Sequence, residues 1–193
     1  MIDSNWVILG ALIGFSGGLT YAINTLRGKT KPNLVTWFIW ALAPFVAFSA
    51  EIDKGIGILA LMTFMAGFSP LMVFVASFFN KKSAWRLGKM DIVCGTLSIL
   101  GLILWFIFKD GDIAILFAIL ADLLAGIPTL IKAYFYPETE NYWLYLGAIV
   151  NSSIALLTIQ IWNFAHYGFP LYILLFCILA FILIKFKIGK LFK

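Results

Sequence analysis

Long apolar runs separated by short polar connections fill nearly the whole chain. Seven runs can be distinguished, over residues 5–26, 34–51, 55–80, 91–108, 113–136, 142–162 and 169–186. Each is long enough for a helix to cross the hydrocarbon of a bilayer, which takes about 20 residues. The strands of a membrane β-barrel would instead alternate apolar and polar residues over about 10 positions. Because backbone groups in hydrocarbon must pair internally, the pattern predicts about seven transmembrane α-helices.

Composition places the chain among membrane proteins. Hydrophobic residues make up 63% of the 193 positions, charged residues make up only 12%, and the mean hydropathy is +1.01. A soluble domain carries about 25% charged residues. We therefore expect an all-α, polytopic integral membrane protein in which residues 1–193 form a single transmembrane domain. The first run follows the acidic Asp3, whereas a signal peptide begins with basic residues, so we expect this run to be a true span.

Basic residues are concentrated on one side of the predicted bundle. This side holds 12 of the 14 lysines and arginines, namely Arg27, Lys29, Lys31, Lys81, Lys82, Arg86, Lys89, Lys132, Lys185, Lys187, Lys190 and Lys193. The other side has only Lys54 and Lys109, together with five acidic residues. The positive-inside rule then predicts an N-terminus outside and a C-terminus in the cytoplasm, with an odd number of spans in the plasma membrane. The lipid bilayer and its anionic headgroups are the expected partner of the basic side.

Comparison of the chain with itself at an offset of 108 residues indicates an internal repeat. Gly18, Asn33 and Trp37 fall on Gly126, Asn141 and Tyr145, respectively. This match predicts three helices in 1–80, a linker containing the fourth helix in 81–112, and three helices in 113–193. A second match, of 66–71 with 125–130, predicts three two-helix units and a last helix instead. Chance likeness between glycine-rich helices is a third reading, and the sequence leaves all three open.

The three-one-three layout, the outside N-terminus and a proline-centred helix before a short polar loop resemble the PQ-loop superfamily, which includes the SWEET sugar transporters. The resemblance covers most of the chain, but Pro128-Thr129 in the second half and Thr20-Tyr21 in the first stand where the family has Pro-Gln. It implies a carrier whose central cavity offers an asparagine and a tryptophan to the substrate, and Asn151 is the matching type of residue. The loop Gly-Lys-Thr-Lys-Pro-Asn at 28–33 also resembles that of small bacterial membrane proteins of unknown function, which implies no activity.

Asp122 is the residue that most strongly suggests a site. An acid at the centre of a membrane helix costs about 2.5–3.5 kcal/mol and normally faces protein or water. Asp122 lies in the middle of the fifth run, and Asn151, Ser152 and Ser153 lie in the middle of the sixth. These groups predict either a site for a proton, a cation or a polar solute, or hydrogen bonds that only join helices. The short connection predicts that the fifth and sixth helices are antiparallel neighbours, with Thr158 near the depth of Asp122.

Three further sets of residues bear on movement and packing. The candidate hinges are Pro44, Pro70 and Pro128, which interrupt three different runs. A stripe of small residues, Gly10, Gly14, Gly17 and Gly18, predicts a close helix contact within the chain or in a homo-oligomer. Aromatic residues near the starts of runs, Trp37, Trp40, Tyr142, Trp143 and Tyr145, are typical of anchors at the membrane interface.

The leading hypothesis is a membrane carrier of a small, sugar-like or similar polar solute, passive or proton-coupled, with Asp122, Asn151, Trp37 and Lys132 along its path. The alternative is a non-transporting scaffold that binds a partner or lipid. A carrier should contain a water-accessible cavity at Asp122 or Asn151, and a scaffold should be packed solid there. An enzyme, a metal site and a cofactor are not expected, since the chain has one histidine, two cysteines in apolar runs and no phosphate-binding or zinc motif. A nucleic-acid partner is not expected either, because the basic residues do not alternate with aromatics.

Overall fold

The computed structural model describes residues 2–79, 85–108 and 111–191, and all regular structure in them is helical. The helices are α1 (Trp6–Leu26), α2 (Leu34–Asp53), α3 (Leu61–Phe79), α4 (Lys89–Phe108), α5 (Gly111–Phe135), α6 (Tyr142–Thr158), α7 (Phe164–Lys185) and the short α8 (Ile188–Leu191). Two 3₁₀ turns, η1 (Gly57–Ala60) and η3 (Pro137–Thr139), precede α3 and α6. The predicted all-α class is therefore confirmed, and a helix lies at each of the seven predicted runs.

Among the described residues, five helical segments are long and apolar enough to cross a membrane. They are α1, α2, η1 together with α3, α5 and α7, and α6 is a shorter apolar helix. Two predicted boundaries near the end of the chain were wrong. The sixth run was expected to reach residue 162 and the seventh to begin at residue 169. Instead α6 ends at Thr158 and α7 begins at Phe164, because the Asn163 side chain accepts a hydrogen bond from the His166 N–H and caps α7 there.

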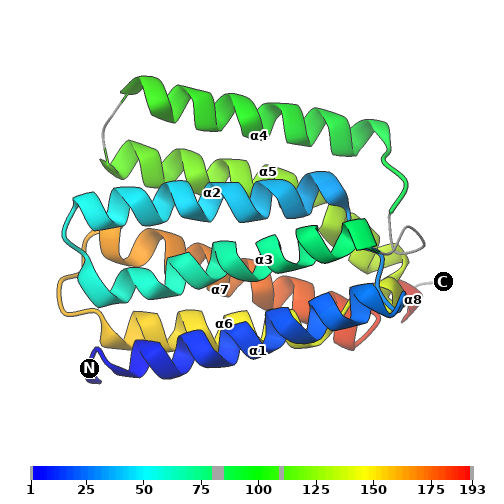
Figure 1. Ribbon diagram of the computed structural model, residues 1–193, viewed down its shortest axis with the longest axis horizontal. Coiled ribbons are helices and arrows are strands. Elements are labelled where there is room, and N and C mark those ends of the chain that lie inside the picture. Colours follow the sequence, from blue (N-terminus) through cyan, green and yellow to red (C-terminus); the bar gives the residue numbers. More distant parts are fainter. Residues whose placement is uncertain (1, 80–84, 109–110, 192–193) are drawn as a thin grey trace.

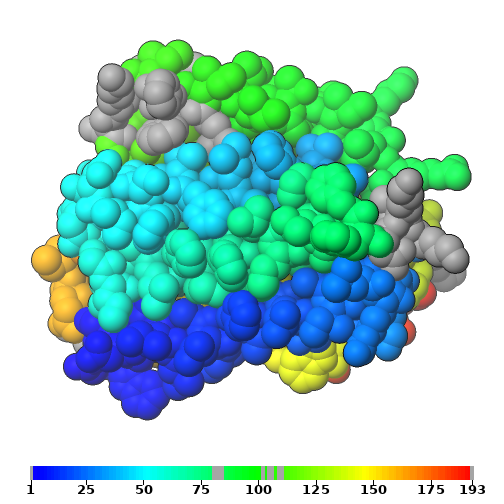
Figure 2. Space-filling model, in the orientation of Figure 1, coloured from blue at the N-terminus to red at the C-terminus, as the bar shows by residue number. Residues whose placement is uncertain are grey.

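The long helices run side by side along the longest axis of the molecule, and the two termini lie at opposite ends (Figure 1). Helix α3 packs against both α1 and α2, and α7 packs against both α5 and α6. Helix α1 also packs along α6, α2 packs along α5, and α4 lies against α5 at the edge of the bundle. In the space-filling view, side chains of α1, α2 and α3 cover one face without a gap between the helices (Figure 2).

On α5, mainly small residues face the interior of the bundle, and large apolar residues face outward. The buried face of α5 includes Ala114, Ala118, Ala121 and Ala125, which recur at the spacing of one helix face. Exposed residues of the same helix include Leu116, Leu120 and Leu123. Helix contacts in membranes are typically built from small residues, since lipid is as apolar as leucine. This distribution is consistent with a membrane bundle.

The glycine stripe of α1 is covered by helices of the same chain. A Cβ atom at Gly17 would lie 2.7 Å from the Trp143 carbonyl oxygen of α6, and one at Gly147 of α6 would lie 3.0 Å from the Ile13 oxygen of α1. A Cβ atom at Gly18 would lie 2.5 Å from the Ser69 Cβ of α3. The predicted close contact is confirmed, and it holds α1 against both α6 and α3.

Asparagine side chains and a glycine set the helix ends on the side where the basic residues gather, which we call the basic end. The Asn33 Oδ1 accepts from the backbone N–H groups of Val35 and Thr36 and caps α2. Asn141 accepts from the Trp143 N–H and caps α6 in the same way. Helix α1 stops before Gly28, whose φ of 72° lies in the left-handed region that favours glycine. Lys81, Lys82 and Lys193 of the predicted basic side, and Lys109 of the opposite side, lie outside the described residues.

The short helix α8 is tied to the loop before α6. The Lys190 ammonium lies 2.8 Å from a carboxylate oxygen of Glu138, and both side chains are about half exposed. The hydrogen bond from Lys190 lowers the pKa of the Glu138 carboxyl below its ordinary value of 4.5. Because this pair is exposed to solvent, it fixes the position of α8 more than it stabilises the fold.

Candidate functional site

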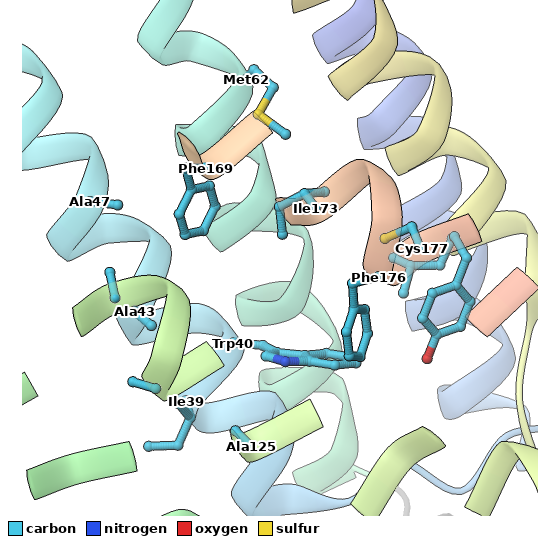
Figure 3. Close-up of a cluster of buried hydrophobic side chains, with 14 of the residues drawn as sticks. Ile39, Trp40, Ala43, Ala47, Met62, Ala125, Phe169, Ile173, Phe176 and Cys177 are labelled. Atoms are coloured by element: carbon cyan, nitrogen blue, oxygen red, sulfur yellow. The ribbon is translucent and has the colours of Figure 1, made fainter. Parts of the chain in front are cut away.

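A cavity of about 60 Å³ lies in the middle of the bundle, and five helices contribute most of its wall, with one glycine from a sixth. Its lining residues are Gly14 of α1; Trp40 of α2; Met62, Met65, Ala66, Ser69 and Pro70 of α3; Asp122 of α5; Leu144, Tyr145, Ala148 and Asn151 of α6; and Ile173, Phe176 and Cys177 of α7. Figure 3 shows Trp40 of α2 beside Phe176 of α7, with Ile173 and Cys177 on the same helix as Phe176. The volume is sufficient for a few water molecules.

Asp122 faces this cavity and not lipid, as the cost of a lipid-facing acid predicted. It is only 3% exposed, and its Oδ2 accepts a hydrogen bond of 2.7 Å from the Tyr172 hydroxyl of α7. The expected partners on α6 were wrong. Helix α7 packs between α5 and α6, so the predicted antiparallel contact of α5 with α6 does not form along their lengths. A short connection brings the ends of two helices together but does not make their sides pack.

Asn151 lines the same cavity from α6. Its side chain lies against Gly10 and Gly14 of α1, where the missing side chains leave room for the amide. Asn151 is 3% exposed, and its Oδ1 has no hydrogen-bond partner among the described residues. The neighbouring Ser152 and the deeper Thr158 each donate to carbonyl oxygens of their own helix and are not cavity residues. Asn151 is thus the one member of the polar group on α6 that reaches the cavity.

Trp40 takes the cavity position that the sequence suggested for Trp37. Trp37 is fully buried against Tyr21, with 4.5 Å between ring centroids, and does not line the cavity. Trp40, one turn further along α2, packs edge-on against Phe176 at 5.4 Å and donates from Nε1 to the Asp122 carbonyl oxygen at 3.0 Å. The expectation that Trp37, Trp40 and Tyr145 are interface anchors was wrong, because all three are buried inside the bundle. Trp143 is half exposed.

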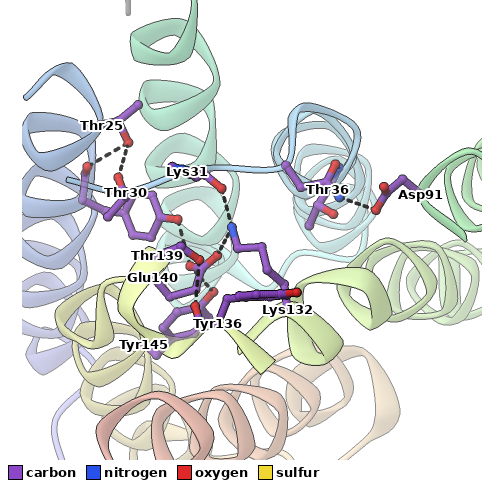
Figure 4. A network of polar contacts seen from close by, with 12 residues as sticks. Thr25, Thr30, Lys31, Thr36, Asp91, Lys132, Tyr136, Thr139, Glu140 and Tyr145 are labelled. Carbon is purple, nitrogen blue, oxygen red and sulfur yellow. Dashed lines mark hydrogen bonds and ion pairs between the residues drawn. The ribbon is translucent and has the colours of Figure 1, made fainter. Parts of the chain in front are cut away.

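Lys132 belongs to a buried polar network at the basic end and does not line the cavity (Figure 4). Its Nζ lies 2.5 Å from the Glu140 Oε1, and the two side chains are 2% and 0% exposed. The Glu140 Oε2 accepts hydrogen bonds from the Tyr21 hydroxyl at 2.8 Å and from the Tyr145 hydroxyl at 3.4 Å. Tyr145 also lines the cavity, so the network forms part of the cavity wall on this side.

The loop at 28–33 joins the network to four other parts of the chain. The Thr30 hydroxyl is 2.9 Å from that of Thr25 in α1, and the Lys31 N–H donates to the Thr139 carbonyl oxygen. The Lys31 carbonyl oxygen accepts from the Lys132 ammonium. The Pro32 carbonyl oxygen accepts from the Trp85 N–H, and the Asn33 amide donates to Asp91 of α4. The loop therefore connects the basic ends of α1, α4, α5 and α6.

The three candidate hinge prolines lie inside continuous helices. Pro44, Pro70 and Pro128 are buried in α2, α3 and α5, and Pro70 lines the cavity. In the two turns before Pro128, three carbonyl oxygens of α5 accept hydrogen bonds from side chains of α2 and α4. The donors are Thr36 to Ala125, Trp40 to Asp122, and Ser98 to Ala121. These bonds hold α5 in place around the proline. Pro170 in α7 is a fourth such residue, which was not predicted as a hinge.

Several residues of the site were not predicted. Glu140 was not predicted because it lies in a polar connection, where acidic residues are common. Its position on a strongly basic side nevertheless indicates that it could pair with a basic residue. Tyr172 was missed because nothing in the sequence pairs it with Asp122. Glu51 is a further buried acid, in the last turn of α2, with a hydrogen bond from Thr63 and an Oε2 that has no partner among the described residues. It lies toward the end opposite the basic end and does not line the cavity.

No family model, curated protein or solved structure matches this chain. The described residues contain no group of three or more histidine, cysteine or acidic side chains that could hold a metal ion. Function must therefore be inferred from the cavity and the network alone.

Proposed function

We propose that this protein is a membrane carrier for a small polar solute, passive or proton-coupled, that works by alternating access. The observation that carries the proposal is the central cavity that brings Asp122 and Asn151 together from different helices. A polar group in the membrane is costly, and two of them around an open space favour a binding site over simple helix packing. A scaffold needs no such space, so the cavity supports a carrier over a partner-binding scaffold.

The helix packing supports an arrangement of two three-helix halves, 1–80 and 113–193, joined by the linker 81–112, with seven spans in total. In each half the third helix packs between the first two, and the contact of α1 with α6 has its counterpart in that of α5 with α2. Four pairs of cavity residues are related by the offset of 108. They are Gly14 with Asp122, Trp40 with Ala148, Met65 with Ile173, and Ser69 with Cys177. This pattern favours the three-helix repeat over repeated helix pairs, and parallel repeats of this kind carry their site between the halves.

The small cavity and the network beside it support a conformation that is closed at the basic end. Pockets that hold drug-sized ligands typically measure about 300–1,000 Å³, which is several times the present volume of about 60 Å³. Opening a path toward this end requires the ion pair between Lys132 and Glu140 to separate or to move as a unit. The prolines of α2, α3 and α5 offer points at which helices can bend during this movement, and bending at Pro128 would require the side-chain bonds from α2 and α4 to break.

The orientation follows from the basic end. We propose that this end faces the cytoplasm of a cell whose plasma membrane holds the protein, with the N-terminus outside. Single cysteines at positions 3 and 29, in a chain whose Cys94 and Cys177 are replaced by alanine, test this. In intact cells an impermeant thiol reagent should label Asp3→Cys and spare Lys29→Cys. The opposite labelling pattern would reverse the proposed orientation.

Uptake into liposomes tests the carrier function directly. Purified protein is reconstituted and assayed with a panel of sugars, amino acids, amines and vitamins. The variant Ala148→Phe places a ring in the cavity, and Leu157→Phe places the same ring on an outward-facing position of the same helix that is 57% exposed. We expect a solute that enters with the wild type and with Leu157→Phe but not with Ala148→Phe. If folded wild-type protein moves no solute of the panel faster than empty liposomes, the carrier proposal fails.

A further inference from the structure

The cavity offers a carboxyl group and hydrogen-bond acceptors, and no basic side chain lies among its described lining residues. Asp122 supplies the carboxyl group. The cationic side chain on the same helix, Lys132, is ten residues further along α5, or about 15 Å away at 1.5 Å per residue. It is already paired with Glu140. Lys132 is therefore not a partner for the Asp122 carboxyl group.

The remaining polar groups of the cavity are suited to a donor ligand. Asn151 is 3% exposed, and its Oδ1 makes no hydrogen bond within the described residues. Its Oδ1 lies toward Gly10, which is not a lining residue, and its Nδ2 lies toward the lining residue Gly14, so a half-turn of the amide group presents the oxygen to a ligand. The Tyr145 hydroxyl, by contrast, is directed to Glu140 and is not free to donate. A ligand that donates hydrogen bonds thus finds acceptors at Asp122 and Asn151.

Aromatic rings form another part of the wall. Trp40, Tyr145 and Phe176 line the cavity, with ring centroids 5.4 Å apart between Trp40 and Phe176 and 6.5 Å apart between Trp40 and Tyr145. The negative faces of such rings attract organic cations. A hard metal ion would instead need about six or more oxygen ligands, which a wall of aromatic and methionine side chains does not supply. An anion would find no basic side chain among the described lining residues.

We propose that the cavity binds a small ammonium-type cation, either ammonium or the protonated amine of a short primary alkylamine. The ammonium group would donate hydrogen bonds to Asp122 and Asn151 and lie against Trp40 and Phe176. The cavity volume of about 60 Å³ fits a group of this size. This inference names the solute of the proposed carrier and so rests on that function for its biological meaning, but binding itself can be measured without transport.

Binding is tested on the purified full chain in detergent by titration with methylammonium chloride at constant ionic strength. Isothermal titration calorimetry reports occupancy, with sodium chloride and methanol as the charged and the neutral comparison ligands. We expect saturable binding of methylammonium, with affinity for methanol and sodium at least about tenfold weaker. If the wild-type protein binds methylammonium and methanol equally well, the proposal is refuted, and no variant is needed to show this.

Two matched variants of α5 locate the site. Asp122→Asn should weaken methylammonium binding at least about tenfold. Asp112→Asn makes the same change on the same helix, at an exposed residue outside the cavity, and should leave binding unchanged. Unaltered binding by folded Asp122→Asn would refute the proposal. If methylammonium binds but no solute of the panel enters liposomes, this inference stands and the carrier function fails, whereas uptake of a neutral solute without methylammonium binding would do the reverse.

Discussion

The buried ion pair at the basic end should be a major contributor to stability, and Lys132→Met tests this. Methionine keeps most of the length of the side chain but removes its charge and its donors. In the wild type the ammonium contacts Glu140 at 2.5 Å, donates to the Lys31 carbonyl oxygen and lies 5.0 Å from the centroid of the Trp85 ring. Its loss leaves a fully buried carboxylate with hydrogen bonds from two tyrosines only. Removing one partner of a buried pair costs about 3–5 kcal/mol, and we expect a loss of this size in the free energy of unfolding.

Glu140→Gln should cost less than Lys132→Met. The remaining lysine keeps the Lys31 carbonyl oxygen and the Trp85 ring, and the new amide oxygen still accepts from the tyrosines, so we expect a loss of about 1–3 kcal/mol. The double variant should be more stable than the sum of the two losses implies, by at least about 1 kcal/mol, because it leaves no unpaired buried charge. Unfolding by sodium dodecyl sulfate in mixed micelles, followed by circular dichroism, measures all three.

An exposed ion pair of the same chain provides the control. Lys54 pairs with Asp112 at 2.7 Å, but these side chains are 34% and 51% exposed. Lys54→Met should therefore change the free energy of unfolding by less than about 1 kcal/mol. If Lys54→Met and Lys132→Met lower the free energy of unfolding equally, burial does not determine the strength of an ion pair in this protein. The network would then not hold the basic end closed as strongly as we infer.

Two further predictions concern glycines at helix contacts. Gly17→Ala should destabilise the protein by about 1–3 kcal/mol, since its Cβ would lie 2.7 Å from the backbone oxygen of Trp143. Gly14→Ala should cost less, because its nearest contact, at 3.3 Å, would be the Asn151 side chain, which can shift. Both are measured by the same unfolding assay, and equal effects would contradict the close approach of the α1 and α6 backbones at Gly17. Gly126→Ala should reduce methylammonium binding, because its Cβ would lie 2.6 Å from the Phe176 ring and would displace that ring from the cavity wall; unchanged binding would show that the ring position is unimportant.

The positions of the helices along the chain could be predicted from the sequence with good accuracy, whereas the contacts between helices could not. Apolar runs fix where helices form because backbone groups in hydrocarbon have no other partner. Asparagines at positions 33, 141 and 163 then fix where three of them begin. Connection length gave the wrong neighbour for α5, since α7 packs between α5 and α6. Which helices become neighbours depends on which of their faces fit together. A uniformly apolar sequence does not indicate which face of a helix packs against another helix and which faces lipid.

The candidate site was predictable only where a residue is costly in lipid. Asp122 and Asn151 stood out because a polar group at the centre of an apolar helix must face protein or water. Trp37 and Trp40 could not be told apart, because both are apolar enough to face lipid or protein and only the helix rotation separates them. In a soluble helix, polar positions would mark the outer face, but here the outer face is as apolar as the core. For the same reason, the sequence did not indicate that Tyr172 and Phe176 belong to the site.

Glu140 and Asp122 are both buried acids, and they differ in what balances their charge. Glu140 has Lys132 at 2.5 Å and two tyrosine donors, so its site is complete within the chain. Asp122 has one tyrosine donor, no ion pair among the described residues, and a cavity on its open side. A complete site holds helices together, whereas we propose that the incomplete site at Asp122 accepts a cation. This difference places the closure of the bundle at Glu140 and the recognition of the solute at Asp122 in our proposal.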